Sequence, residues 1–329
     1  MVPFRRAIAR FAVASALLGA AGGFVHAAEQ VRYAVIVGNN QGNTPARSLR
    51  YAEQEVTRLS SILKERGDFE GMVILRGSNR QEVELALRAA RGKLEEARAA
   101  GKPTLFLFYY SGHGDNEALE LGSSRFPLRD LRTYLETLPA DVRLAFVDAC
   151  QSGALTGVKG GHRAPAYEVR LADPGTVRGM AIVTSSTANE LSQESDDLQG
   201  SYFSHNIMAG LKGLADASRD GQVTLSELYN FAFRRTLAGT AASLIGGQHP
   251  TYVYQMSGTG EVILTRTRPK DAQVMFPREG GVTYSVLHRG EVAAELVSSA
   301  EQDLYLALPA GDYKVVRRQM AQVAARDLT

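Results

Sequence analysis

Two short hydrophobic runs near the middle of the chain have the clearest pattern in the sequence. Residues 104–110 (TLFLFYY) lead into residues 111–114 (SGHG), and residues 142–147 (VRLAFV) lead into residues 148–153 (DACQSG). Apolar runs of this length, rich in aromatic and β-branched residues and closed near a glycine, are typical of buried strands in a parallel sheet. Leucine recurs at helical spacing in residues 128–138. The sequence therefore predicts a strand–helix–strand unit with parallel, neighbouring strands.

The same alternation of strand-like and helix-like segments extends over most of the chain. Further strands are predicted at residues 31–37, 72–75 and 179–185, and further helices at residues 49–63, 83–94, 200–213 and 223–237. Residues 117–126 are predicted to form a hairpin. Residues 252–255 and 261–265 are predicted to pair with each other as closing strands. This order predicts an α/β fold over residues 30–267, a three-layer sandwich with a mostly parallel central sheet. In such sheets the functional site forms outside the carboxyl ends of the strands.

The pattern changes at about residue 269. Residues 282–287 and 304–316 alternate apolar and polar positions around turn residues, which indicates β-hairpins. Residues 269–329 are therefore predicted to form a small β module that is barely large enough to be stable alone. The sequence indicates neither a catalytic function nor a binding partner for this module.

The first residues have the pattern of a targeting segment. Three arginines within residues 5–10 precede an apolar stretch at residues 11–25, and small residues follow at 25–28. This is typical of a secretory signal peptide, so we expect residues 1–27 to be removed on export to the periplasm or the cell exterior. The alternative is an uncleaved anchor, but the stretch is short for a membrane span. We therefore expect no stable membrane span after cleavage.

Composition narrows the chemistry further. The chain has 329 residues, of which 44% are hydrophobic, and a formal net charge of +2. This content is enough for one large α/β domain, and the near-zero charge gives no basic footprint for nucleic acid. Exported proteins usually use cysteines in even numbers, as disulfides. Cys150 is the only cysteine, which excludes an intramolecular disulfide.

His113 and Cys150 each follow one of the two central runs, so the predicted sheet places both at the same edge, one strand apart. An imidazole beside a thiol raises the thiolate fraction and can later protonate a leaving group. The pair therefore indicates a Cys-His hydrolase. The alternative interpretation of Cys150 is a buried small apolar residue at a strand end. No other histidine lies in a Cys/His cluster with metal-ligand spacing.

The motifs at residues 110–114 (YSGHG) and 148–153 (DACQSG) resemble those of the caspase-like cysteine peptidases of family C14, most closely the bacterial metacaspase-like branch. The resemblance covers residues 31 to about 267. It implies Cys150 Sγ as nucleophile, His113 as general acid/base, and an oxyanion hole formed by the backbone N–H groups of Gly114 and Cys150. It also implies peptide or protein substrates and no cofactor for catalysis.

In metacaspases, acidic and hydroxyl groups around the nucleophile bind a basic P1 side chain. By motif position these groups correspond to Asp148, Ser111 and an acid on the first helix, which aligns best with Glu55 and alternatively with Glu53. Animal caspases carry Gln at the position of Asp148, so this residue points away from cleavage after Asp. The family usually has Asp at the helix position, which leaves the choice between Arg and Lys open. The alternatives are a turn acid capping backbone N–H groups for Asp148 and a solvated helix face for Glu55.

Residues 154–178 have glycine and proline but no sustained period, and a loop of this length in a compact domain is usually functional. The loop contains four basic residues, Lys159, Arg163, Arg170 and Arg178. Because related enzymes mature by self-cleavage, these residues make the loop a candidate for it.

Residues 216–227 (DASRDGQVTLSE) fit the loop of an EF-hand. Oxygen-bearing side chains stand at loop positions 1, 3, 5, 9 and 12, with glycine at position 6 and an apolar residue at position 8. The candidate metal ligands are Asp216, Ser218, Asp220, Gln222 and Glu227. The sequence thus predicts Ca²⁺ binding, and metacaspase-like enzymes are often stimulated by calcium. The alternative is an acidic turn before a helix that Asp220 or Thr224 caps.

Together these patterns predict an exported caspase-like cysteine endopeptidase that cleaves after Arg or Lys and is stimulated by calcium. Two other hypotheses stay open. One is a catalytically idle caspase-like module that binds partners through residues 269–329, and the other is a related Cys-His amidase. The Cys-His pair favours an enzyme, since a scaffold has no use for an activated thiol.

Overall fold

The computed structural model describes residues 29–43, 48–155, 177–241, 243–267, 272–298, 300, 303–308, 310–319 and 322–328. The predicted signal peptide and most of the predicted self-cleavage loop, residues 156–176, lie outside the described residues. None of the helices within these ranges is long and apolar enough to cross a membrane.

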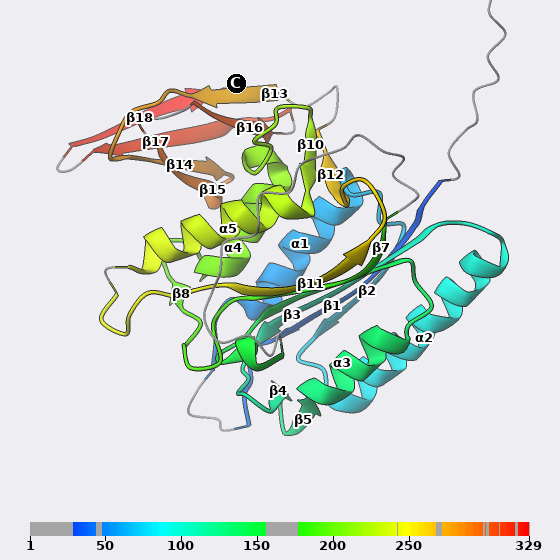
Figure 1. The fold of residues 1–329 in the computed structure, drawn as a ribbon. Coiled ribbons are helices and arrows are strands. Elements are labelled where there is room, and N and C mark those ends of the chain that lie inside the picture. The colour runs from blue at the N-terminus through cyan, green and yellow to red at the C-terminus, as the bar shows by residue number, and fades with distance from the viewer. Residues whose placement is uncertain are drawn as a thin grey trace, which may run out of the picture.

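A six-stranded sheet forms the centre of the fold, in the order β11-β7-β6-β3-β1-β2 (Figure 1). Its strands are β1 (Val31–Asn39), β2 (Gly71–Arg76), β3 (Thr104–Gly112), β6 (Val142–Asp148), β7 (Arg178–Thr184) and β11 (Thr251–Ser257). The first five are parallel, and β11 runs antiparallel to β7 at one edge. The predicted mostly parallel sheet is thereby confirmed.

Helices cover both faces of this sheet and complete the three layers (Figure 1). One face carries α1 (Ala52–Arg66), α4 (Tyr202–Ala209) and α5 (Leu225–Thr240), and the other carries α2 (Arg80–Ala99) and α3 (Leu128–Thr137). Successive residues of β3 point to opposite faces, so Tyr109 packs on the α1 side and Tyr110 on the α2 side. Burial on both faces explains why β3 and β6 are near-continuous apolar runs in the sequence.

The strand order reverses between β1 and β3, because β2 lies on one side of β1 while β3, β6 and β7 lie on the other. Ligands of open α/β sheets bind outside the carboxyl ends of the strands at such a reversal. Asn39 at the end of β1 is in register with Gly112 at the end of β3. The loops that follow these two strands therefore start side by side.

Two hairpins flank the carboxyl edge of the sheet. The predicted hairpin at residues 117–126 is formed by β4 (Ala118–Leu121) and β5 (Ser124–Pro127). A second, shorter one pairs β8 (Glu194–Ser195) with β9 (Gly200–Ser201). A 3-10 turn (Ser152–Leu155) follows Cys150.

Two predictions for the later part of this domain are wrong. The segments at 252–255 and 261–265 do not pair with each other, because β11 joins the central sheet while β12 (Ile263–Arg266) pairs with β10 (Gln222–Thr224). Val223, predicted to be helical, lies in β10, and α5 begins only at Leu225, after the N-cap Thr224, which forms a capping box with Glu227 inside the helix. The predicted helix at 200–213 is α4 followed by a π-helical turn (Gly210–Leu214).

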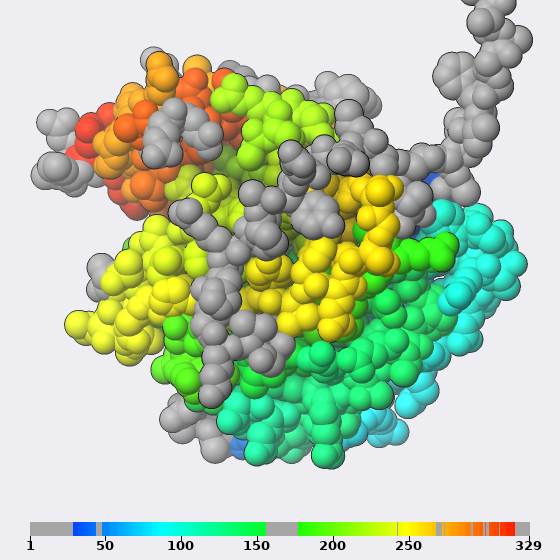
Figure 2. All heavy atoms as spheres, in the orientation of Figure 1, coloured from blue at the N-terminus to red at the C-terminus, as the bar shows by residue number. Residues whose placement is uncertain are grey.

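The β module packs against the α4 side of the α/β domain. Its strands are β13 (Ala272–Phe276), β14 (Val282–His288), β15 (Glu291–Ser298), β16 (Leu304–Leu308), β17 (Tyr313–Gln319) and β18 (Gln322–Leu328). They form an antiparallel sheet in the order β15-β14-β17-β18 and a separate β13-β16 pair. Val286 and Leu306 of the module belong to the same hydrophobic cluster as Val56 of α1 and Ile207 of α4. In the space-filling view the module, orange to red, adjoins the yellow-green segment (Figure 2).

Candidate active site

His113 and Cys150 leave the sheet at the same edge. Ser111 of β3 and Asp148 of β6 are register partners, and His113 and Cys150 each follow their strand partner by two residues. Because the strands are parallel and adjacent, the chain ends of both point the same way. Both side chains are partly exposed. The structure thus brings the two predicted catalytic residues to neighbouring strand ends.

The two loops that carry these residues are in contact. A Cβ atom on Gly114 would lie 3.0 Å from Cβ of Ala149 and 3.8 Å from the carbonyl oxygen of Cys150. A Cβ on Gly42, in the loop after β1, would lie 2.9 Å from Cδ2 of His113, so only glycine leaves room for the imidazole there. Within the described residues, Nε2 of His113 is buried and has no hydrogen-bond partner.

The backbone after His113 is held by β4. The N–H of Asp115 donates to the carbonyl of Ala118 at 3.0 Å, and the N–H of Glu120 donates to the carbonyl of His113 at 2.9 Å. Gly114 stands between His113 and Asp115 in the sequence, and its own N–H takes part in neither of these two hydrogen bonds. That donor is the one predicted to face an oxyanion.

Buried serine hydroxyls support the turn at Cys150. Ser185 and Ser186, both fully buried, each place Oγ 3.3 Å from the carbonyl oxygen of Ala149. Gln151 has φ of +56°, a left-handed conformation that a non-glycine residue adopts only when its surroundings hold it there. The nucleophile candidate therefore lies on a sharp turn with a fixed base.

A buried acidic cluster lies beside this turn, on the α1 side of the sheet; we define it as Asp148 and Glu55 with the hydroxyl groups bound to them. Asp148 Oδ2 accepts hydrogen bonds from Oγ of Ser204 at 2.6 Å and from Oγ of Ser201. Its Oδ1 accepts one from Oγ of Ser192 at 2.6 Å. All three partners are side-chain hydroxyls, so Asp148 is not a turn acid that caps backbone N–H groups.

Glu55 faces the same cluster from α1. Its Oε2 accepts a hydrogen bond from Oγ of Ser111 at 2.6 Å, and its Oε1 accepts one from the N–H of Ser201 at 2.7 Å. The residue is 1% exposed, which contradicts a solvated helix face. Glu53 is only partly buried, and its Oε1 accepts the N–H of Asn40 in the loop after β1. The structure thus places Glu55 with Ser111 and Asp148, and Glu53 elsewhere.

The cluster brings buried carboxyl groups so close together that they affect one another's ionisation. Burial, and next to it the nearby Asp148, raise the pKa of Glu55 to about 7, although two hydrogen bonds oppose the shift. Burial also raises the pKa of Glu194, a half-buried acid close enough to act on both. None of the ion pairs among the described residues involves these three acids. A cationic group is therefore the electrostatic complement of the cluster.

Sequence reasoning missed the three serines that hold Asp148. Ser201 is the N-cap of α4, and its Oγ accepts the N–H of Ser204 at 2.9 Å. A serine before an amphipathic stretch is a recognisable cap signal. Nothing local indicates that the same hydroxyl also donates to a carboxylate 53 residues earlier in the chain.

The predicted calcium loop, residues 216–227, follows the π-helical turn, includes β10 and extends into the first turn of α5. Asp216 Oδ1 accepts the N–H of Asp220 at 3.2 Å, Asp220 Oδ1 accepts the N–H of Gln222 at 2.8 Å, and Glu227 Oε1 accepts the N–H of Ser218 at 2.9 Å. Burial raises the pKa of Asp216. Across the described ranges, no group of three or more His, Cys, Asp or Glu side chains is arranged to hold a metal ion.

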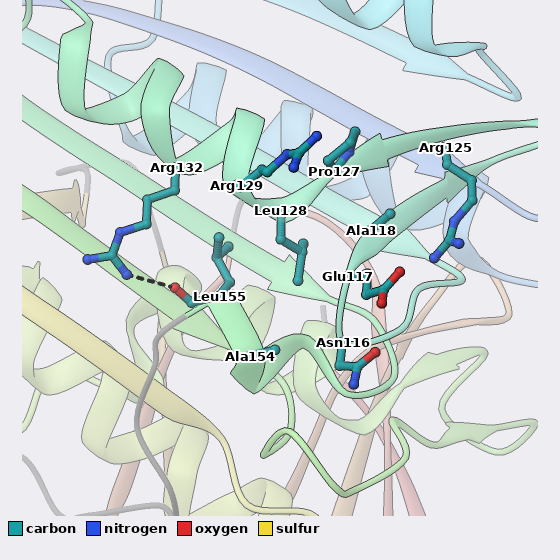
Figure 3. Close-up of a pocket in the computed structure, with 10 residues that line it drawn as sticks. All are labelled: Asn116, Glu117, Ala118, Arg125, Pro127, Leu128, Arg129, Arg132, Ala154 and Leu155. Atoms are coloured by element: carbon teal, nitrogen blue, oxygen red, sulfur yellow. Dashed lines mark hydrogen bonds between the residues drawn. The ribbon is translucent and has the colours of Figure 1, made fainter.

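A cavity of about 640 Å³ lies on the α3 side of the sheet, next to the residues that follow His113 and Cys150 (Figure 3). It is lined by Asn116, Glu117, Ala118, Arg125, Pro127, Leu128, Arg129, Arg132, Ala154 and Leu155. Arg125 is paired with Asp115, and Arg132 donates to the carbonyl of Leu155 at 3.3 Å. The cavity contains none of the predicted site residues, because the acidic cluster lies on the opposite face.

The fold and the site define a three-layer α/β protein with an imidazole and a thiol at the ends of neighbouring parallel strands. The sequence model of the caspase domain of peptidase family C14 matches residues 31–257, more than half of the chain. The chain therefore belongs to the caspase-domain family of C14 peptidases, which are cysteine peptidases. The resemblance inferred from residues 110–114 and 148–153 is thereby confirmed at the level of the family.

Two solved structures are similar to this chain, and the first supports the fold. Caspase-1 from Spodoptera frugiperda is similar with a TM-score of 0.50 and 15% sequence identity, over 78% of this chain and 99% of that chain. The structure of pro-sf-caspase-1 is similar with a TM-score of 0.49 and 15% identity, over 76% of this chain and 97% of that chain. At this identity the first likeness shows the fold alone. No curated protein matches this chain.

Proposed function

We propose that this chain is a cysteine endopeptidase that cleaves peptide bonds after Arg or Lys, with Cys150 as nucleophile and His113 as general acid/base. The observation that carries the proposal is the acidic cluster beside Cys150, in a chain that belongs to a family of cysteine peptidases. The family supports the reaction type, and the cluster supports the substrate class.

The reaction proceeds in two displacements. His113 takes the proton of the thiol, and Sγ of Cys150 attacks the carbonyl carbon on the P1 side of the scissile bond. The imidazolium then protonates the leaving amine as the C–N bond breaks, which leaves a thioester on Cys150. Water, deprotonated by His113, attacks the thioester carbonyl; the C–S bond breaks, which releases the new carboxylic acid and leaves the Cys150 thiolate beside the imidazolium. No metal ion or cofactor takes part in these steps.

The N–H groups of Gly114 and Cys150 serve as the oxyanion hole. Two observations support this role: the bridge to β4 leaves the N–H of Gly114 outside its hydrogen bonds, and Gly114 lies against the Ala149–Cys150 backbone. Preorganised donors of this kind stabilise the charge that develops on the carbonyl oxygen in the transition state.

The acidic cluster receives the P1 side chain. A guanidinium or ammonium near Asp148 and Glu55 would form charge-assisted hydrogen bonds with carboxylate oxygens that now accept only hydroxyl and N–H groups. An aspartate at P1 would instead bring a further carboxylate next to Asp148 and Glu55, with Glu194 also close by. The cluster therefore favours Arg and Lys and disfavours Asp.

Peptidyl chloromethyl ketones test the proposal directly, because they alkylate a catalytic thiol only when the peptide is seated. We expect a ketone with Arg at P1 to modify Cys150, detected by mass spectrometry of the intact protein. The same peptide with citrulline, the uncharged isostere of Arg, should react at least about tenfold more slowly. Equal rates for the two would overturn the assignment of the cluster, and no reaction with either would overturn the peptidase.

We further propose that the enzyme is of the metacaspase-like type and is exported. The motif residues 110–114 and 148–153 support the first point, and the signal-peptide pattern of residues 1–27 supports the second. The N-terminal sequence of the protein recovered from the periplasm or medium tests export.

We also propose that residues 216–227 bind Ca²⁺ and that binding stimulates the peptidase. The support is the match to the EF-hand template, with carboxylates at Asp216, Asp220 and Glu227. Their oxygens hold backbone N–H groups of the same loop, so a bound cation would replace these hydrogen bonds. The loop runs into the first turn of α5, which packs against α4, and α4 carries Ser204, a donor to Asp148.

A further inference from the structure

One contact between the β module and the α/β domain is made by the edge of the module's four-stranded sheet, beside the packing of β16 against the π-helical turn. β15 is the edge strand of the order β15-β14-β17-β18, so one row of its backbone groups has no strand partner. Two side chains bind that row, His205 of α4 and Lys212 of the π-helical turn that follows α4. Lys212 donates to the carbonyl of Ala293 at 2.7 Å, and Nε2 of His205 accepts the N–H of Glu295 at 3.2 Å.

The hydrogen bond to His205 is partly buried and depends on one protonation state of the imidazole. His205 is 7% exposed, and burial lowers its pKa to about 3, so the imidazole is neutral. A neutral ring accepts a hydrogen bond at one nitrogen only. Loss of this acceptor would remove the partner of the partly buried N–H of Glu295 and so weaken the contact between α4 and β15.

His205 is also the direct neighbour of the acidic cluster. The preceding residue, Ser204, donates to Asp148 at 2.6 Å, and the N-cap Ser201 binds both acids. Adjacent residues of a helix point about 100° apart, so one turn of α4 reaches the cluster with Ser204 and the module with His205. α4 has only eight residues, and its N-terminal half carries all of these contacts.

We propose that the β module positions the substrate-binding acids, and that His205 is the positioning residue that transmits this support through α4. We call this arrangement the clamp. Backbone groups of β15 bind His205 and Lys212 and thereby fix the position of α4. Ser201 and Ser204, at the start of α4, in turn bind Asp148. The inference rests on the proposed function insofar as the acidic cluster binds the P1 cation. It assigns to residues 272–328 a role in substrate binding rather than in recruiting a partner.

Substitution of His205 tests the clamp. In His205→Leu the acceptor is lost, and we expect the KM for a P1-Arg peptide to rise about tenfold, equivalent to about 1.4 kcal/mol, while kcat stays within about twofold. In His205→Gln the amide oxygen can accept the same N–H, so the KM should return to near the wild-type value. Lys212→Met should raise the KM in the same direction as His205→Leu.

Two controls separate this role from general damage to the fold. His288→Leu changes a module histidine that contacts Asp312 instead of α4, and it should leave the KM unchanged. Iodoacetamide alkylates Cys150 without binding to the acidic cluster, so the rate of this alkylation should be the same in all variants. If kcat and the alkylation rate fall together with the affinity in His205→Leu, or if its KM equals that of wild type, the proposal is wrong.

A second readout is independent of peptidase activity. We expect amide hydrogen exchange in α4 to be faster in His205→Leu than in wild type and to be restored in His205→Gln. If the wild-type protein does not cleave basic substrates but the three proteins show this pattern of exchange, the proposed function is wrong and the clamp is supported. Unchanged exchange in α4 would overturn the clamp whatever the activity.

Discussion

Ser192 connects the nucleophile candidate with the acidic cluster: its Oγ donates to Asp148 Oδ1 at 2.6 Å, and its carbonyl oxygen lies 3.9 Å from Sγ of Cys150. One residue therefore contacts both the thiol and the acid. A substrate whose P1 side chain lies at Asp148 would have its scissile carbonyl close to Cys150, as a preorganised reaction requires. The short path from Cys150 through Ser192 to Asp148 is the structural basis for the predictions below.

Neutralising either acid should weaken binding of basic substrates. For Asp148→Asn and Glu55→Gln we expect kcat/KM on a P1-Arg peptide to fall about 10- to 100-fold, since hydrogen bonds to charged groups contribute about 1.5–3 kcal/mol. Steady-state kinetics with the Arg and citrulline peptides checks this, because the citrulline peptide should lose little. Glu53→Gln, a change of the same type outside the cluster, should behave as wild type. Equal losses of kcat/KM in all three variants would show that general negative charge in this region, and not the acidic cluster, favours the P1-Arg peptide.

The raised pKa of Glu55 predicts a pH-dependent KM. Below pH about 7 the carboxyl is neutral and binds a cation weakly; above it the carboxylate is present. The KM for a P1-Arg peptide should therefore fall as the pH rises from about 6 to about 8, by up to about tenfold per pH unit below the pKa. The pH profile of KM in wild type and in Glu55→Gln measures this. A wild-type KM that does not change with pH, or that changes equally in the variant, would contradict the assignment.

The same group predicts how stability depends on pH. The folded-state pKa of Glu55, about 7, lies above its ordinary value of 4.5, so the folded protein binds this proton more tightly. Its contribution to stability is fully present below pH about 4.5 and is lost as the pH rises through about 7. Relative to Glu55→Gln, wild type should lose up to about 3 kcal/mol of unfolding free energy between pH 4.5 and 8, at about 1.4 kcal/mol per pKa unit. Urea unfolding of both proteins at several pH values measures the difference, and parallel curves would refute it.

Calcium binding at residues 216–227 should be visible without any substrate. Titration of the protein with Ca²⁺ in a calorimeter should show one site, and saturating Ca²⁺ should raise the melting temperature. Asp216→Asn combined with Glu227→Gln should abolish both effects and any stimulation of cleavage. Asp68→Asn, an exposed aspartate outside the loop, serves as the matched control. Binding that survives the double substitution would place the cation elsewhere.

Local patterns predicted the elements that position the catalytic candidates. The runs 104–110 and 142–147 are buried strands because both faces of the sheet are covered, and the strand–helix–strand rule then makes them neighbours. Glu55 could be assigned to the cluster only through the family resemblance. On its own the sequence shows an acid in the first turn of a helix, next to Glu53, and nothing local decides which of the two is buried.

Features that depend on distant pairing were not predicted. β11 and β12 have the alternation of strands, but alternation does not specify a partner, and each pairs with a strand other than its neighbour in the chain. The link between His205 and β15 spans 90 residues and joins a side chain to a backbone N–H. No residue pattern encodes such a contact, so the position of the β module over α4 came only from the structure.

The most direct test of the central claim compares cleavage of four fluorogenic peptides that differ only at P1, with Arg, Lys, citrulline or Asp. Wild type and Cys150→Ala would be measured side by side, each with Ca²⁺ and with a chelator. We predict turnover of the Arg and Lys peptides by wild type only, at least about tenfold above the citrulline peptide, and none of the Asp peptide. Cleavage of the Asp peptide alone would contradict the role of Asp148 and Glu55. Turnover that persists in Cys150→Ala, or its absence from folded wild type under every condition, would contradict the cysteine peptidase itself.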